Sequence, residues 1–149
     1  MTTAILLAYI GVFFMVGVAG MASAIGTAIS GITAVGAMKK NPNGFGSYMI
    51  LSALPGSQGL YGFVAYFMVS GFLVPEITMF QGIAIFGGGL VMGLAALSSA
   101  YMQARVCANG IAAIGNGHDV MTKTLILAAF PELYAILGLA AVFLISIAI

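Results

Sequence analysis

Hydrophobic and polar positions divide the chain into four long apolar runs, which are separated by three short polar segments. Each run is longer than the about 20 apolar residues that a helix needs to cross the hydrocarbon of a bilayer. We therefore expect an all-α membrane protein of four transmembrane helices, arranged as two tandem, parallel-duplicated helical hairpins. The runs cover approximately residues 4–38, 46–73, 79–114 and 121–149, so the hairpins span residues 4–73 and 79–149.

Composition supports a lipid environment for the whole chain. Hydrophobic residues make up 62% of the sequence and charged residues only 5%, whereas soluble domains carry about 25% charged residues. The runs and their links use up the sequence, which predicts a single membrane domain over residues 1–149. The first run has full spanning length and no basic segment before it, so we expect a retained helix and not a cleaved signal. A net charge of +1 gives no indication of nucleic-acid binding.

The few charged residues predict an orientation. Lys39 and Lys40 lie in the first Asn/Gly-rich turn and Lys123 follows the second, whereas the link between the hairpins carries only Glu76. Basic residues are enriched in cytoplasmic loops. We therefore expect both polar turns to be cytoplasmic and both termini to be external.

The chain also repeats itself at an offset of 76 residues, which places Pro55 on Pro131 and Ser23 on Ser99. Because each repeat contains two spans, both copies face the same way, unlike the inverted repeats of many transporters. Small residues cluster on the first helix of each hairpin, and such surfaces let helix backbones approach closely. This pattern is compatible with ordinary packing in a bundle, but small residues on nearly every face favour the inner wall of a ring.

Glu132 lies about ten residues into the fourth run, which corresponds to a depth of about 15 Å. A carboxylate near the middle of a membrane is costly and usually functional. The alternative is a protonated side chain that only hydrogen-bonds to a neighbouring helix. The position equivalent to Glu132 in the first repeat is Gly56, so one carboxylate serves four helices.

Further polar side chains fall at the depth of Glu132. They are Ser57, Gln58 and Tyr61 on the second run and Gln103 on the third. Carboxylate, amide and hydroxyl oxygens are ligands of hard cations, and we expect Na⁺ to need about four to six of them. A proton site needs only a buried carboxyl group. The two glutamines therefore favour cation binding over a role as interhelical hydrogen bonds, which remains the alternative.

Two prolines flank this level. Pro55 and Pro131 each remove one backbone donor and free a carbonyl four residues earlier, at Leu51 and Leu127. We expect this to loosen the helix beside the site, although prolines in membrane helices are also simply tolerated.

The segments Leu54–Phe63 (LPGSQGLYGF) and Pro131–Gly138 (PELYAILG), in a chain of two fused hairpins with an acid only in the last helix, resemble the proteolipid rotor-ring subunit of bacterial V-type rotary ATPases. The resemblance covers the whole chain. It implies a ring of identical copies in a prokaryotic plasma membrane, with the first and third helices inside. It also implies a stator subunit whose buried arginine opens the Glu132 site, a central stalk at the two cytoplasmic turns, and ATP hydrolysis by other subunits, so this chain would not be an enzyme.

The same resemblance implies a set of ion-binding residues. In the sodium-pumping members it places Na⁺ between the Leu54 carbonyl and four side chains, with Tyr61 hydrogen-bonded to the carboxylate. The family often has Thr where this chain has Ser57, and Pro131 before the acid also departs from some sodium-type relatives. The four side chains are those of Ser57, Gln58, Gln103 and Glu132.

Three other readings remain open from the sequence. The same ring could carry H⁺, the polar cluster could be the pathway of a stand-alone ion carrier or channel, or the polar groups could only join the helices of a structural membrane protein. No covalent cofactor is expected in any of them.

Overall fold

The computed structural model describes residues 2–149, and its first transmembrane segment is a single helical rod. This rod consists of α1 (Thr3–Val12), a π-helical turn η1 (Phe13–Val18) and α2 (Ala19–Met38). The 36 residues are apolar enough to cross a membrane. At its start, the Ile5 N–H donates to the Thr2 hydroxyl at 3.5 Å, which caps a free backbone donor. The first apolar run thus forms one helix, as predicted, but the π-helical turn was not predicted.

The second transmembrane segment is divided into two helices. After a 3₁₀ turn η2 (Pro42–Gly44), α3 (Phe45–Ala53) leads into a 3₁₀ turn η3 (Leu54–Gly56), and α4 (Ser57–Val69) continues to η4 (Ser70–Phe72). The interruption lies at Pro55, which has no N–H to donate and whose ring hinders the preceding helical turn. The expected loosening beside Pro55 is therefore present in the backbone.

The second hairpin has two uninterrupted helices, α5 (Met79–Gly115) and α6 (Met121–Ala148). Thr78 and Gln81 form a capping box at the start of α5, with bonds of 3.2 and 3.0 Å. After α5, Gly117 has a φ of 91°, a conformation that side-chain-bearing residues rarely adopt. Pro131 lies inside α6, which continues through it. The loosening expected at Pro131 therefore does not interrupt the helix as it does at Pro55.

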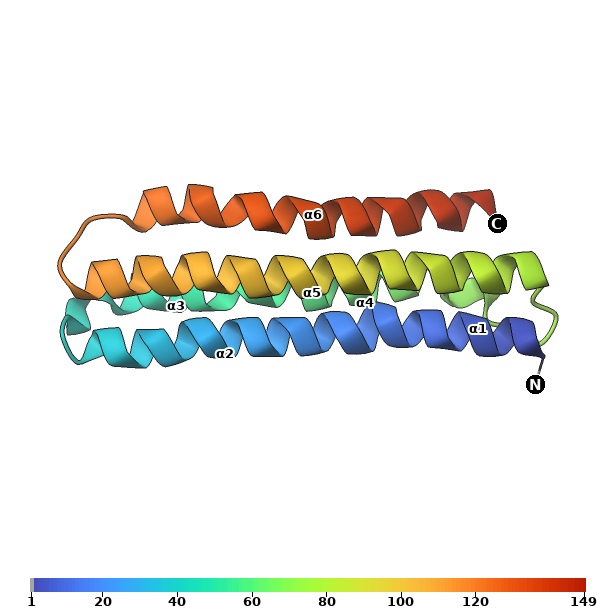
Figure 1. Ribbon diagram of the computed structural model, residues 1–149, viewed down its shortest axis with the longest axis horizontal. Helices are drawn as coiled ribbons and strands as arrows, with labels where there is room; N and C mark the ends of the chain where they lie inside the picture. The colour runs from blue at the N-terminus through green and yellow to red at the C-terminus, as the bar shows by residue number, and fades with distance from the viewer. Residues whose placement is uncertain (1) are drawn as a thin grey trace.

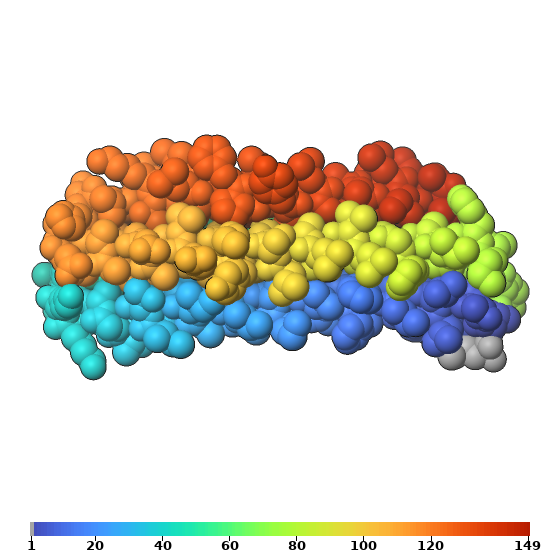
Figure 2. Space-filling model, viewed as in Figure 1, coloured from blue at the N-terminus to red at the C-terminus, as the bar shows by residue number. Residues whose placement is uncertain are grey.

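The helices form a long, narrow bundle in which α5 lies between the α1–α2 rod and α6, with α3 and α4 behind (Figure 1). The two termini lie at one end of the bundle and the two polar turns at the other. On the face shown in Figure 2, the first rod, α5 and α6 run side by side. Three helices are each long and apolar enough to cross a membrane, and the divided segment from Phe45 to Phe72 is the fourth. The predicted fold class is confirmed.

The first rod and α5 contact each other through small residues. A Cβ atom added at Gly89 would overlap the backbone of Gly11, and one added at Gly93 would lie 2.7 Å from the Phe14 carbonyl oxygen. Nearer the polar turns, the Ser30 hydroxyl donates to the Ala104 carbonyl at 3.3 Å. Such close backbone contact is how membrane helices gain packing energy without a hydrophobic driving force. Clusters of buried apolar side chains lie toward the two ends of the bundle, and the predicted site lies between them.

Candidate functional site

Glu132 on α6 is hydrogen-bonded at both carboxylate oxygens. The Tyr61 hydroxyl, from α4, donates to Oε1 at 2.7 Å. The Gln103 amide, from α5, donates to Oε2 at 3.0 Å. The side chain is partly buried, and three different helices therefore meet at this carboxylate.

The two glutamines form a buried network next to this carboxylate. Gln58 and Gln103 are both 0% exposed. Gln58 Nε2 donates to Gln103 Oε1 at 2.8 Å and to Ser99 Oγ at 3.0 Å. Gln103 Nε2 also donates to the Ala128 carbonyl oxygen at 3.0 Å. Two amides buried in the bundle are thereby joined to each other and to Glu132.

One atom of this network has no protein partner among residues 2–149. Gln58 Oε1 is buried and accepts no hydrogen bond. Leaving a buried polar atom without a partner costs about 1–3 kcal/mol, so such atoms call for a physical explanation. An acceptor oxygen of this kind, on a side chain joined through Gln103 to a carboxylate, fits a cation ligand.

Leu54 begins the η3 turn, and Ser57 begins α4 next to Gln58. The Ser57 hydroxyl donates to the Leu54 carbonyl oxygen at 3.1 Å, across the η3 turn that contains Pro55. Within residues 2–149, no hydrogen bond joins either residue to Glu132. The structure thus links Glu132, Gln103, Gln58 and Tyr61 in one network, whereas Ser57 and Leu54 form an adjacent pair of oxygens.

Sequence reasoning did not identify two members of this network, Ser99 and the Ala128 carbonyl. In the sequence Ser99 stands out only as the repeat partner of Ser23. In the structure its repeat partner has a similar place, because Ser23 Oγ accepts a hydrogen bond from the Gly59 N–H of α4 at 2.7 Å. The role of the Ala128 carbonyl had no signal in the sequence.

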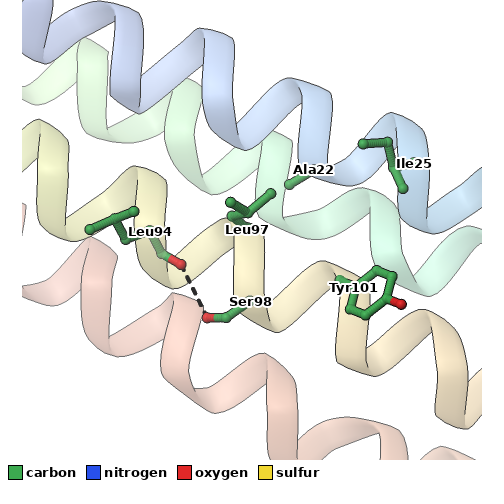
Figure 3. Close-up of a pocket in the computed structure, with 6 residues that line it drawn as sticks. All are labelled: Ala22, Ile25, Leu94, Leu97, Ser98 and Tyr101. Carbon is green, nitrogen blue, oxygen red and sulfur yellow. Dashed lines mark hydrogen bonds between the residues drawn. The ribbon is translucent and has the colours of Figure 1, made fainter.

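A different groove, of about 370 Å³, lies between α2 and α5 (Figure 3). Its one polar side chain in the figure besides the Tyr101 phenol, Ser98, donates to the Leu94 carbonyl oxygen of its own helix at 3.1 Å. The groove therefore offers a mainly apolar surface and no cluster of ion ligands. It is lined by Ala22, Ile25, Leu94, Leu97, Ser98 and Tyr101.

Chemically, the Glu132 network suits the binding of a small cation. It combines one carboxylate with amide and hydroxyl oxygens, which are the ligands that hard cations prefer. A single carboxylate neutralises one positive charge, so a monovalent cation leaves the site without net charge. Apolar side chains surround it in the membrane-spanning part of the bundle.

Comparison with known proteins gives the family of the chain. The model of the ATP synthase C subunit family matches twice, at residues 10–69 and 86–145. The chain is 38% identical over 125 residues to the V-type sodium ATPase subunit K of Enterococcus hirae, with 84% of this chain and 80% of that protein covered. It is 34% identical over 139 residues to the A-type ATP synthase subunit K of Methanocaldococcus jannaschii. That alignment covers 93% of this chain but 61% of the archaeal protein.

The two family matches fall one in each hairpin, which agrees with the internal repeat. They also agree with a multi-pass membrane protein and with a subunit that is not itself catalytic. From the duplicated family match and both relatives, we conclude that the chain belongs to the ATP synthase C subunit family, in its duplicated V/A-type subunit K form.

Proposed function

We propose that this protein is a rotor-ring subunit of a V/A-type ATPase and that it carries Na⁺ across the membrane on Glu132. The observation that carries the proposal is the Glu132 network, in which a mid-membrane carboxylate is held by Tyr61 and Gln103. A bare carboxylate in hydrocarbon costs several kcal/mol. Cation binding removes this charge, so that a loaded site can pass through lipid while an empty one cannot.

Two features support Na⁺ over H⁺ as the transported ion. The first is the pair of buried glutamines joined to Glu132, whose amide oxygens can serve as ligands of a cation, whereas a proton needs only the carboxyl group. The second feature is the buried, unpartnered Gln58 Oε1. We propose that Na⁺ is held by the Leu54 carbonyl and the side chains of Ser57, Gln58, Gln103 and Glu132.

The remaining residues of the site support the ligands. Tyr61 orients the carboxylate through its 2.7 Å hydrogen bond. Pro55 interrupts the helix at η3, so that the Leu54 carbonyl accepts a 3₁₀-type bond from the Ser57 N–H next to the site. Pro131 precedes Glu132 and removes one backbone donor from that turn of α6.

Assembly with copies of itself is supported by two unpartnered surfaces. On α2, Gly20, Gly31 and Gly36 have open space where a Cβ atom would lie. On the other side of the bundle, an open groove runs between α5 and α6 and includes Pro131. The offset of 76 residues places Gly20 on Ala96, one of the buried small residues of α5. We propose that the α2 surface of one copy contacts the α5–α6 groove of the next, which closes a ring.

The other proposed partners follow from family membership. They are a stator membrane subunit whose arginine meets Glu132, central-stalk subunits at the two polar turns, and a soluble head that hydrolyses ATP. In this arrangement the polar turns are cytoplasmic, the termini are external, and the ring lies in a prokaryotic plasma membrane with lipid around it.

The proposal is tested by labelling Glu132 with a hydrophobic carbodiimide in membranes at fixed pH, with Na⁺, with K⁺, or with neither. We expect Na⁺ to slow labelling and K⁺ to have no effect, because only the bound ion shields the carboxylate. If only pH changes the rate, the transported ion is H⁺ and the Na⁺ assignment is wrong. Ion flux through the purified subunit alone in liposomes would instead indicate a carrier or channel and contradict the rotor role.

A further inference from the structure

The first transmembrane rod contains a turn of π-helix, η1, at Phe13–Val18. Turns of this kind are rare and frequently occur next to functional sites. The repeat offset places η1 on residues 89–94, which are regular α-helix within α5. The π-helical turn is therefore specific to the first hairpin.

Helix α4 packs directly on this turn at Gly62. A Cβ atom added at Gly62 would overlap the Met15 carbonyl oxygen and would lie 2.6 Å from Ala19 Cβ. Met15 and Ala19 are both 0% exposed, so this contact lies in the interior of the bundle. The missing side chain at Gly62 therefore determines how closely α4 approaches the first rod.

Gly62 directly follows Tyr61, whose hydroxyl donates to Glu132 at 2.7 Å. Tyr61 itself is partly buried and packs against the cluster that contains Met15 and Ala19. Any movement of α4 away from η1 thus also moves the phenol that holds the carboxylate.

The equivalent glycine of the second hairpin has a looser contact. A Cβ atom added at Gly138 would lie 3.0 Å from Ala95 Cβ and 3.6 Å from the Met92 Cα atom. Ala95 is the repeat partner of Ala19, so the two glycines share one equivalent neighbour. The backbone overlap with a carbonyl oxygen is found at Gly62 and not at Gly138.

We propose that Gly62 is a positioning residue for the Glu132 site. By lacking a side chain, it lets α4 rest on the π-helical backbone at Met15, and this contact sets Tyr61 at hydrogen-bonding distance from Glu132. The inference rests on the proposed function, because it assigns to this contact a part of the affinity for the transported ion.

Replacing Gly62 by Ala should weaken ion binding through Tyr61. Overpacked sites relieve strain by backbone shifts, here on the order of 1 Å. A shift of this size stretches the 2.7 Å bond between Tyr61 and Glu132 toward the limit of about 3.5 Å at which a hydrogen bond is lost. Loss of one hydrogen bond to a charged group lowers affinity about tenfold or more.

The test measures the Na⁺ concentration that halves carbodiimide labelling of Glu132 in the assembled enzyme. We expect it to rise about tenfold in Gly62→Ala and in Tyr61→Phe, and to change less than about twofold in the matched control Gly138→Ala. The double variant Tyr61→Phe/Gly62→Ala should be no weaker than the weaker single variant, because both changes remove the same bond.

A purely structural role predicts a different pattern. Wild-type protection in assembled Gly62→Ala, or losses that add up in the double variant, would overturn the proposal. If Gly62→Ala does not assemble, Ala19→Gly/Gly62→Ala removes one of the two obstructing groups. When assembled, this double variant should lose part of the protection by Na⁺. Wild-type protection in it would also contradict the role of the contact.

Failure of this inference is distinguishable from failure of the proposed function. If Na⁺ does not slow labelling of the wild-type enzyme, the Na⁺ assignment fails first. The pH midpoint of labelling then serves as the readout. Equal midpoints in Gly62→Ala and Tyr61→Phe, both different from Gly138→Ala, would still support the positioning role, and a wild-type midpoint in Gly62→Ala would refute it.

Discussion

In the second hairpin Glu132 on α6 is bonded to Gln103 on α5 at 3.0 Å, whereas the equivalent positions of the first hairpin are Gly56 and Thr27. A Cβ atom at Gly56 would lie 3.5 Å from Thr27 Cγ2, which is ordinary contact. The Thr27 hydroxyl donates to the Ser23 carbonyl of its own helix at 2.9 Å. The two hairpins therefore share a close-packed helical frame at this level, but only the second carries the carboxylate and the amide that contacts it.

This difference means that the ion site depends on a few side chains and not on the hairpin fold itself. Both hairpins place a serine of their first helix against α4, with Ser23 Oγ at 2.7 Å from the Gly59 N and Ser99 Oγ at 3.0 Å from Gln58 Nε2. The frame supplies close packing at this depth in each copy. The carboxylate and the Gln103 amide come from the second copy, and Gln58 of the first copy completes the network.

The largest effect is expected from removing the one carboxylate. Glu132→Gln should abolish ion transport and coupled ATP hydrolysis in the reconstituted enzyme, because the amide cannot neutralise a cation, while the ring still assembles. Glu76→Gln, an exposed carboxylate in the link between the hairpins, is the control and should transport normally. Normal ion transport by Glu132→Gln would contradict the proposed function.

The second-largest effect is expected from removing the amide of Gln103, which donates to Glu132. Gln103→Leu removes the bonds to Glu132 and to the Ala128 carbonyl and leaves Gln58 with one partner fewer. We expect the Na⁺ concentration for half-maximal transport to rise about 30- to 100-fold. The matched change in the first hairpin is Thr27→Val, which should shift this concentration less than about twofold. Similar shifts in both variants would show that the hairpins are not functionally different.

Adding a carboxylate to the first hairpin tests whether the frame alone makes a site. In a Glu132→Gln background, Gly56→Glu should react with carbodiimide, since the position is only partly buried. Labelling should be insensitive to Na⁺, because Thr27 offers no amide and its hydroxyl is used within its own helix. Mass spectrometry of the labelled peptide gives the answer, and clear protection by Na⁺ would mean that the frame suffices.

The smallest effect is expected where the hairpins meet at the polar turns. Lys40 Nζ donates to Asn116 Oδ1 at 3.0 Å on an exposed surface, and these residues are repeat partners. Exposed polar pairs contribute little to stability. Lys40→Ala should lower the midpoint of thermal ring dissociation by no more than about 2 °C. A much larger drop would show that the turns hold the hairpins together.

Helix boundaries and depths could be predicted from the sequence because they follow from one-dimensional information. Apolar run length defines the spans, and a rise of about 1.5 Å per residue places Glu132, Gln58 and Gln103 at one level. The offset of 76 residues identified the duplication. These quantities need no knowledge of how helices rotate about their axes.

The hydrogen-bond network and local backbone could not be predicted, because they depend on rotation and packing. Tyr61 donates to one carboxylate oxygen of Glu132 and Gln103 to the other, which depends on how three helices are rotated against one another. The two repeats align at a constant offset of 76 residues on both sides of Phe13–Val18, so no inserted residue in the sequence indicates the π-helical turn. Pro55 and Pro131 looked equivalent in sequence, yet only Pro55 interrupts its helix.

The glycine at position 56 also bears on the energetics of the proposed motor. With one carboxylate per four helices, a ring of given circumference carries half as many ions per revolution as a ring with an acid in every hairpin. The energy of each ATP is then divided among fewer ions. Each ion can therefore be driven against a steeper gradient. In the proposed motor, the absence of a carboxylate at position 56 thus sets the number of ions moved per ATP.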